Sequence, residues 1–194
     1  MKATVEKVQA VHDGTEILLT ITVASLSPRT HTYRIPTEQY LSAGSPAEGD
    51  TLDGDTLSFL TAEEDTRLAY ARAVKILAAG DNTRRALARK LSERGFSKQC
   101  AEDAVERLVK DGYVREDELL LRQLGIYAKR LWGPKKFLPN LIEKGFARAD
   151  IEAALVRAKA EGVYDADEVK RRLLAELPSE DPSQKRAWLY KHGF

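Results

Sequence analysis

The residues best suited to chemistry in this sequence are lysines and arginines that gather about every 50 positions. The three groups are Arg84, Arg85, Arg89 and Lys90, then Lys129, Arg130, Lys135 and Lys136, and last Lys185 and Arg186. Guanidinium and ammonium groups in a row can pair with nucleic-acid phosphates or with acidic side chains of a protein. The same groups also fit the solvated faces of a charged helical protein, so the clusters alone leave both interpretations open.

No combination of side chains points to catalysis or metal binding. The chain has no nucleophile paired with a base, no zinc-ligand spacing and no glycine-rich phosphate loop. His12, His31 and His192 lie far apart in the sequence, and the one cysteine, Cys100, has no histidine nearby. We therefore predict that the protein is not an enzyme and uses no metal or other cofactor.

Charge is divided unevenly along the 194 residues. Residues 1–66 hold 4 Lys and Arg against 11 Asp and Glu, a net charge of −7, whereas residues 67–194 hold 27 against 19, a net charge of +8. An acidic first third followed by a basic remainder suggests that the remainder meets a negative partner.

The expected compartment is the cytoplasm. No apolar run approaches the roughly 20 residues of a membrane span, and the amino-terminal residues lack the apolar core of a secretion signal. A single cysteine allows no internal disulfide and fits a reducing compartment.

The elements that position the basic residues are predicted by an internal repeat. The stretch Leu91–Phe96 returns 50 positions later as Leu141–Phe146, and a third version is Leu189–Phe194. Sliding residues 84–117 onto 134–167 without a gap gives nine identities in 34 positions. A repeat of this length is typical of stacked helical units, in which each unit needs its neighbour to bury an apolar face.

Each unit is predicted to contain three helices. The middle helix follows Thr83 in the first unit and ends at Gly95 in a left-handed conformation, and Ser97 caps the third helix. The face of the first helix recurs at a spacing of 50 as three sets of residues: Tyr70, Val74, Leu77 and Ala78; Leu120, Leu124, Tyr127 and Ala128; Lys170, Leu174 and Leu177. The units span residues 66–115, 116–164 and 165–194, and the third lacks its last helix.

Prolines and acidic pairs refine these boundaries. Pro139 lies inside the middle helix of the second unit, so that helix is expected to kink or to begin late. Pro178 and Pro182 bracket a linker, after which Ser183 opens the last helix. The pairs Glu63-Glu64 and Glu116-Asp117 are expected at helix N-termini, where carboxylates stabilise the helix dipole.

Residues 1–60 are predicted to form a small β extension. Residues 3–11 and 16–24 are rich in β-branched side chains, and the turn residues His12–Thr15 between them indicate a hairpin. Thr30–Ile35 adds a third strand, Thr37–Leu41 a short helix or turn, and Leu52 marks a short strand before the helical pattern returns at Thr56. The predicted fold is therefore mostly α, with a small N-terminal β element and tandem three-helix repeats, two complete and a third truncated.

The helical part resembles the RecX family of regulatory proteins. The resemblance rests on Thr83–Phe96, Asp111–Glu118 and Gly133–Phe146, and it covers residues 66–164 well and 165–194 loosely. It implies three tandem three-helix repeats that bind along the groove of the RecA filament on single-stranded DNA and restrain ATP hydrolysis and strand exchange. Carried onto this sequence, it places these residues against the filament: Arg84, Arg85, Arg89, Lys90, Lys135 and Lys136.

Two other functions fit the same residues. The chain could be a repeat protein that binds nucleic acid directly, without RecA, or a helical scaffold for another acidic protein. Direct DNA binding weakens steeply with salt and persists without recombinase, whereas regulation of a filament needs the recombinase. Weak direct binding to DNA is compatible with the first function, and neither a membrane nor a small-molecule substrate is expected.

Overall fold

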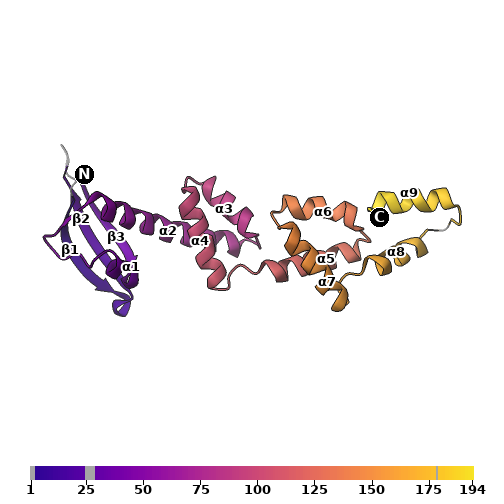
Figure 1. The fold of residues 1–194 in the computed structure, drawn as a ribbon, viewed down its shortest axis with the longest axis horizontal. Coiled ribbons are helices and arrows are strands. Elements are labelled where there is room, and N and C mark those ends of the chain that lie inside the picture. Colours follow the sequence, from indigo (N-terminus) through magenta and orange to yellow (C-terminus); the bar gives the residue numbers. More distant parts are fainter. Residues whose placement is uncertain (1–2, 25–28, 178) are drawn as a thin grey trace. The chain divides into compact units, whose positions relative to one another are not determined.

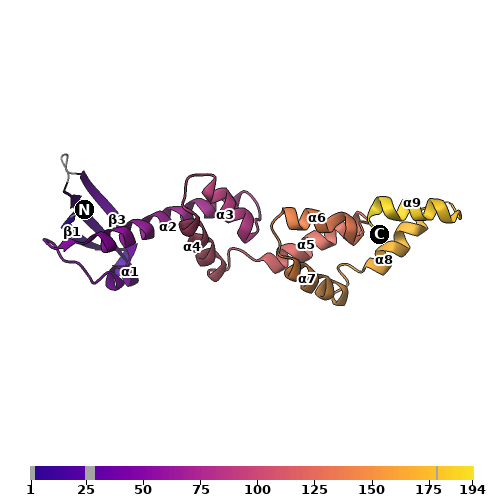
Figure 2. The same ribbon diagram turned by 45° about the horizontal axis from the view of Figure 1, so that its top comes forward.

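The computed structural model of the chain describes residues 3–24, 29–177 and 179–194. It is mostly helical with an N-terminal sheet, which confirms the predicted fold class (Figures 1 and 2). The chain forms two compact units: residues 1–76 with 90–107, and residues 77–89 with 108–194. Pro178, predicted to begin a linker, lies outside the described residues.

The N-terminal sheet is antiparallel, with strand order β3-β2-β1-β4. Its strands are β1 (Ala3–Val11), β2 (Glu16–Val23), β3 (Arg29–Pro36) and β4 (Thr51–Leu52). β1 and β2 form the predicted hairpin around a short 3-10 turn, His12–Gly14, and α1 (Thr37–Ser42) follows β3. The predicted strands and short helix are therefore confirmed to within one or two residues.

One face of the sheet forms the core of this unit. Leu19, Ile21 and Ile35 are fully buried there, and Leu60 from α2 (Gly54–Ala78) joins them. The opposite face is polar, because side chains alternate between the two faces of a strand. On that face, threonines of β2 and β3 pair by hydroxyl hydrogen bonds, Thr20 with Thr32 and Thr22 with Thr30, each at 3.2 Å.

α2 begins at Gly54, two residues before the predicted Thr56, and is one continuous helix to Ala78. The Asp53 carboxylate accepts a hydrogen bond from the backbone N–H of Thr56 at 2.7 Å, which caps the helix and holds the pKa of Asp53 below its usual value. Glu63 and Glu64 therefore lie inside α2, and their predicted place at a helix N-terminus is wrong. Glu63 instead pairs with Arg107 at 2.9 Å, which ties α2 to α4 (Lys98–Lys110).

The remaining helices follow the predicted series. They are α3 (Arg84–Ser92), α5 (Glu116–Lys129), α6 (Pro134–Glu143), α7 (Arg148–Ala160), α8 (Ala166–Ala175) and α9 (Pro182–His192). The predicted Ser97 cap is confirmed, since its hydroxyl accepts from the Cys100 N–H at 3.1 Å. At the start of α3 the cap is Thr83, whose hydroxyl accepts from the Ala86 N–H at 3.1 Å. α9 begins one residue before Ser183, because Asp181 is its N-cap.

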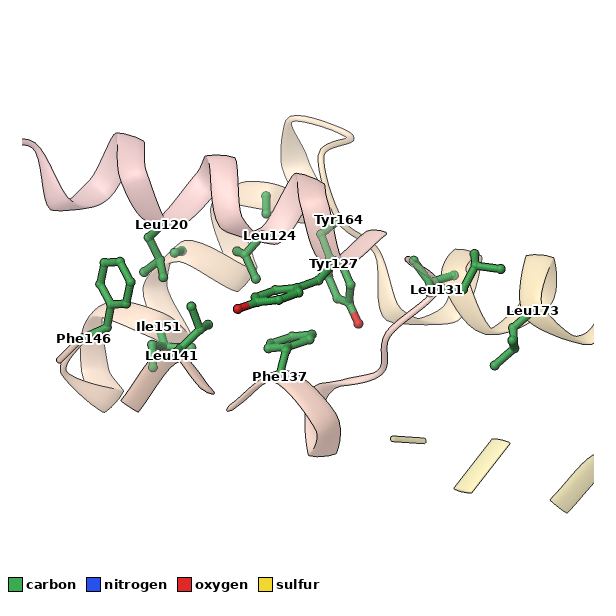
Figure 3. Packing of buried hydrophobic residues seen from close by; sticks show 13 residues of the cluster. Leu120, Leu124, Tyr127, Leu131, Phe137, Leu141, Phe146, Ile151, Tyr164 and Leu173 are labelled. Carbon is green, nitrogen blue, oxygen red and sulfur yellow. The ribbon is translucent and has the colours of Figure 1, made fainter. Parts of the chain in front are cut away.

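The core of the second compact unit is built by α5, α6 and α7 (Figure 3). Tyr127 and Phe137 stack with ring centroids 5.0 Å apart, and Tyr164 meets Phe137 edge-on at 5.2 Å. Leu124 and Leu141 are fully buried beside them. Short helices of about 12 residues are marginal alone, so this packing holds them.

The first helix of each unit is out of register with the predicted spacing of 50. In the second half of α2 the fully buried residues are Ala69 and Ala73, whereas Ala78 is exposed. In α8 they are Val169 and Leu173, whereas Lys170 is exposed. The α2–α3 loop, residues 79–83, is one residue longer than the α5–α6 loop, residues 130–133, so a slide without gaps misplaces the helix before it.

Pro139 does not delay the helix that contains it. α6 begins at Pro134, with Gly133 as its N-cap, and continues through Pro139 to Glu143. The prediction of a late start is therefore wrong. Proline lacks a backbone N–H, so the helix loses one hydrogen bond and becomes less stable. Phe137 and Leu141 on either side of Pro139 are fully buried, and their packing offsets that loss.

Candidate partner-binding site at the joints between units

The repeated Gly-Phe ending is a helix C-cap. Gly95, Gly145 and Gly193 have φ values of +93°, +98° and +87°, which glycine adopts without steric cost. After each glycine, a phenylalanine N–H donates back to the leucine carbonyl five residues earlier, at 3.4, 3.1 and 3.0 Å in chain order. This is the Schellman arrangement, and it confirms the left-handed glycine predicted at position 95.

Two of these caps contact the start of the preceding middle helix. At the first joint, which we define as Thr83, Arg85, Lys144 and Gly145, the Thr83 hydroxyl donates to the Lys144 carbonyl at 2.7 Å. A Cβ added to Gly145 would lie 2.7 Å from the Thr83 hydroxyl oxygen and 3.1 Å from the Arg85 Cβ. The negative C-terminal end of α6 therefore sits against the positive N-terminal end of α3, a favourable pairing of helix dipoles.

The second joint, Gly133, Lys136, His192 and Gly193, repeats this contact with α9 and α6. The Gly133 N–H donates to the His192 carbonyl at 2.6 Å, and the Lys135 N–H donates to the Gly193 carbonyl at 3.0 Å. A Cβ at Gly193 would lie 2.5 Å from the Lys136 nitrogen. The ribbon agrees, since the end of α9 marked C lies beside α6 (Figure 1).

Three of the predicted binding residues are engaged within the protein. Arg84 pairs through Nε with Glu116 at 3.0 Å, and its backbone N–H donates to the other Glu116 oxygen at 2.7 Å. The Lys136 ammonium lies over the Trp132 ring, 4.7 Å from its centroid, and donates to the Lys191 carbonyl at 3.3 Å. The third, Lys185, pairs with Glu180 at 2.5 Å.

Three others are available to a partner. The side chains of Arg85, Lys129 and Lys135 make no hydrogen bond or ion pair with the part of the chain that the structure describes, and all three are exposed. Arg85 and Lys135 are the second residues of α3 and α6, and each lies at a joint. The joints therefore present one available cation each at equivalent positions.

The other predicted cations are placed less regularly. Arg130 lies over the Trp132 ring at 5.5 Å, close to the second joint. Arg186 donates only within its own helix, to the Pro182 carbonyl at 3.4 Å, and it lies toward the end of α9 that is far from the second joint. Arg89 and Lys90 have partners within the described chain.

The aromatic residues near the second joint are structural. Trp132 stacks on Tyr127 with centroids 5.4 Å apart, and its carbonyl accepts a hydrogen bond from the Tyr164 hydroxyl at 3.0 Å. Burial raises the pKa of Tyr164 above its ordinary value. Phe137 is fully buried in the core, whereas Tyr190 is 81% exposed.

A cavity of about 380 Å³ opens beside Arg84, between the N-terminal end of α5 and α7. Its rim holds arginines and carboxylates that pair with neighbours: Arg84 with Glu116 at 3.0 Å, and Arg157 with Asp117 at 3.4 Å. Because the lining holds three arginines against three carboxylates, the cavity does not favour a ligand of either sign.

Other candidate chemistry is not assembled in the described residues. They contain no group of three or more histidine, cysteine or acidic side chains able to hold a metal ion. Cys100 is buried against α2, with its sulfur 3.9 Å from the Ala62 carbonyl, and His192 bonds to the Trp188 carbonyl at 2.9 Å. Within the same residues, no helix is long and apolar enough to cross a bilayer.

Sequence reasoning missed the partners of the basic residues. It did not foresee that Glu116 holds Arg84, that Arg122 pairs with Asp81 at 2.5 Å, or that the repeated glycines receive a neighbouring helix. The recurrence of Gly-Phe was the available signal. A cap glycine explains one such ending, but its return in every unit also indicated a shared contact.

The fold and these joints define a tandem three-helix repeat protein with basic positions where its units meet. Residues 69–108 match the family model described as RecX, first three-helix domain. The chain is 34% identical over 116 residues to the regulatory protein RecX of Pseudomonas syringae pv. tomato, covering 59% of this chain and 75% of that protein. It is 31% identical over 139 residues to the regulatory protein RecX of Pseudomonas putida strain GB-1, covering 70% and 89%.

A solved structure shows the same fold. The crystal structure of a regulatory protein RecX superimposes with a TM-score of 0.65 at 18% identity, covering 99% of this chain and 94% of that one. The chain belongs to the RecX family of regulatory proteins, as its sequence motifs predicted.

Proposed function

We propose that this protein inhibits the RecA recombinase by binding in the groove of the RecA filament on single-stranded DNA, restraining ATP hydrolysis and strand exchange. The observation that carries the proposal is the likeness to regulatory proteins named RecX over most of their length. It implies a regulator rather than an enzyme. A regulator of a recombinase on DNA would act in the cytoplasm.

The available cations at the joints supply a contact surface for such a partner. Arg85 and Lys135 occupy equivalent positions in successive units, and Lys129 lies one loop before the second joint. A regular row of cations suits a filament, because a filament offers acidic side chains and phosphates at regular intervals. Three other predicted contacts, Arg84, Lys136 and Lys185, would act indirectly, by keeping the joints and α9 in place.

The test is a RecA ATPase assay on single-stranded DNA, with and without the protein. We expect the wild-type chain to lower the rate, and the double variant Arg85→Glu, Lys135→Glu to need about 100-fold more protein for the same effect. Arg84 and Lys136 are left unchanged because reversing their charge would break the Arg84–Glu116 ion pair and the contacts of Lys136 with Trp132 and Lys191. An unchanged ATPase rate at saturating wild-type protein would exclude the proposed function.

A matched control separates this site from net charge. Lys98 and Arg148 are the first residues of α4 and α7, also 50 positions apart, and their side chains are 87% and 82% exposed. The double variant Lys98→Glu, Arg148→Glu makes the same change in charge away from the joints. It should inhibit RecA about as well as the wild type.

The same cations also suit the phosphates of free nucleic acid, so direct nucleic-acid binding is the second candidate function. DNA binding that survives without RecA, and that falls steeply between 50 and 200 mM salt, roughly as expected for several phosphate contacts, would favour it. Scaffolding of another acidic protein predicts neither effect.

A further inference from the structure

A glutamate binds a backbone N–H at each outer edge of the N-terminal sheet. β3 is one edge, and β1 is the other beyond β4, which pairs with only two residues at the start of β1. On β3 the Glu64 carboxylate, from α2, accepts from the Arg34 N–H at 3.3 Å. On β1 the Glu48 carboxylate, from the loop before β4, accepts from the Val8 N–H at 3.1 Å. Both edges therefore carry a carboxylate on a donor that would otherwise face solvent.

Glu64 is oriented by an arginine of its own helix. Arg67 donates through Nε to Glu64 Oε2 at 2.9 Å and through Nη2 to Oε1 at 2.7 Å. Oε2 is also the oxygen that accepts from the Arg34 N–H. The Glu64 side chain is 20% exposed, and a two-pronged arginine pair fixes a carboxylate in direction as well as in distance. The bond to the edge of β3 is therefore part of a fixed group of three residues.

Glu48 continues a cover that the backbone begins. The Gly49 N–H donates to the Val5 carbonyl at 2.8 Å, and the Val5 N–H donates to the Asp50 carbonyl at 2.9 Å. Beyond Val5 the pairing of β1 with β2 shifts register at a bulge, and Val8 is the residue whose N–H Glu48 binds. The outer side of β1 is therefore covered in turn by β4, by the backbone of the loop before β4 and by this carboxylate.

Exposed strand edges are where sheets of separate molecules join. Their free N–H and C=O groups can pair with another strand, and natural sheets commonly prevent this with charged side chains and bulges. An incoming strand would need to place a carbonyl on the N–H groups of Arg34 or Val8, which the carboxylates occupy. A charged acceptor holds such a donor more strongly than a neutral carbonyl does. Pairing along the full length of either edge is therefore blocked at that residue.

We propose that Glu48 and Glu64 keep the N-terminal sheet from joining edge to edge with a second copy of this chain. A second copy is the partner to exclude, because two identical β3 edges can pair with each other about a two-fold axis, whereas β1 pairing with β3 would continue from copy to copy. The inference is independent of the proposed function, since it involves none of the residues at the joints. It gives Glu64 a role other than the helix N-terminus that its place in the sequence suggested.

Amide hydrogen exchange tests the two bonds in the wild-type protein. Residues of a strand alternate between its two sides, so Thr32 directs its N–H to the same outer side as Arg34, and Ala10 does so on the side of Val8. No carboxylate of the described residues binds the N–H groups of Thr32 or Ala10. We expect the Arg34 and Val8 amides to exchange about tenfold more slowly than these two, after correction for intrinsic rates, as one net hydrogen bond predicts.

Removing the carboxylates should make the protein associate. We expect the double variant Glu48→Ala, Glu64→Ala to sediment with a weight-average mass about twofold that of the wild type or higher, and the excess to grow with concentration. In the associated form the Arg34 and Val8 amides should be protected again, because carbonyls of the second copy replace the carboxylates.

Net charge is controlled with two other carboxylates. Glu38 and Asp65 are exposed residues of the same compact unit, and neither bonds to a strand edge in the described residues. The double variant Glu38→Ala, Asp65→Ala loses the same charge as the edge variant. It should keep the wild-type mass.

A milder variant covers the case in which the double edge variant does not fold. Glu64→Ala also breaks the ion pair with Arg67, whereas Glu48→Ala alone loses only the bond to Val8 among the described residues. It should associate as well, to a smaller extent. The proposal is overturned if the wild-type Arg34 and Val8 amides exchange as fast as their neighbours, if the variants fold but keep the wild-type mass, or if the charge control associates equally. Association that leaves the two amides unprotected also overturns it.

Discussion

The first and second joints place the same element, a helix ending in Gly-Phe, on a helix N-terminus, but they hold it with different groups. At the first joint the donor is the Thr83 hydroxyl, with the Arg84–Glu116 ion pair alongside. At the second joint the donors are the backbone N–H groups of Gly133 and Lys135. The first connection therefore depends on side chains, and the second depends on close backbone approach.

The strongest way to break the second joint is to add one methyl group. Gly133→Ala should cost about 3 kcal/mol of unfolding free energy, because its Cβ would lie 2.4 Å from the Gly193 carbonyl oxygen, a backbone atom that cannot turn aside. Gly133 has an ordinary φ of −81°, so conformational strain does not enter. Urea unfolding measures the loss, and hydrogen exchange should show fast exchange along α9; unchanged protection of α9 would contradict the joint.

The first joint should break through a hydroxyl instead. Thr83→Val removes both the cap to the Ala86 N–H and the bond to the Lys144 carbonyl, and we expect a loss of about 2 kcal/mol in urea unfolding. Thr83→Ser keeps the hydroxyl and is the control. If serine and valine destabilise the protein equally, the hydroxyl does not hold this joint.

Alkaline pH should distinguish the two joints. Burial raises the folded-state pKa of Tyr164 above 10.0, its ordinary value, so its stabilising effect is complete below about pH 10 and is lost as pH rises toward the folded-state pKa. Tyr164→Phe, which removes the bond to Trp132 beside the second joint, should cost about 1 kcal/mol at pH 8 and flatten this alkaline decline. Unfolding measured from pH 8 to 11 tests it; a decline as steep in the variant as in the wild type would assign the effect to other groups.

The smallest expected effect has the opposite sign. Gly125 lies inside α5, and a Cβ there would meet the Val163 side chain at 3.5 Å, an ordinary contact. Gly125→Ala should stabilise the protein by about 0.5 to 1 kcal/mol, since alanine loses less backbone entropy in a helix. Thermal unfolding should show a higher midpoint. A lower midpoint would mean that a Cβ destabilises the protein even at an uncrowded glycine, so the loss in Gly133→Ala would not be specific to the second joint.

The helices and their caps were predictable because local rules set them. Thr83, Ser97 and Gly95 cap helices through bonds to residues a few positions away, so the sequence alone indicates them. The β strands followed equally from β-branched runs and turn residues. The register of α8 was predicted wrongly, because a spacing of 50 from α5 points to Lys170 and Leu174, whereas Val169 and Leu173, also four positions apart, are the residues that are buried.

The joints were not predictable, because their contacts join residues about 60 positions apart. Thr83 and Lys144 are 61 positions apart, and nothing local to either indicates the bond between them. For the same reason the sequence could not divide the ten basic residues into those held by Glu116, Trp132 or Glu180 and those available to a partner. The charge of each residue follows from the sequence, but which charges pair with one another depends on the fold.

The order in which the caps meet has an electrical consequence. Each joint places the negative C-terminal end of one middle helix against the positive N-terminal end of the middle helix before it, so the partial charges of these helix ends compensate each other. The positive end of α9 at Pro182 is neutralised by Asp181, so the negative end of α3 at Gly95 is the one left without compensation in this series.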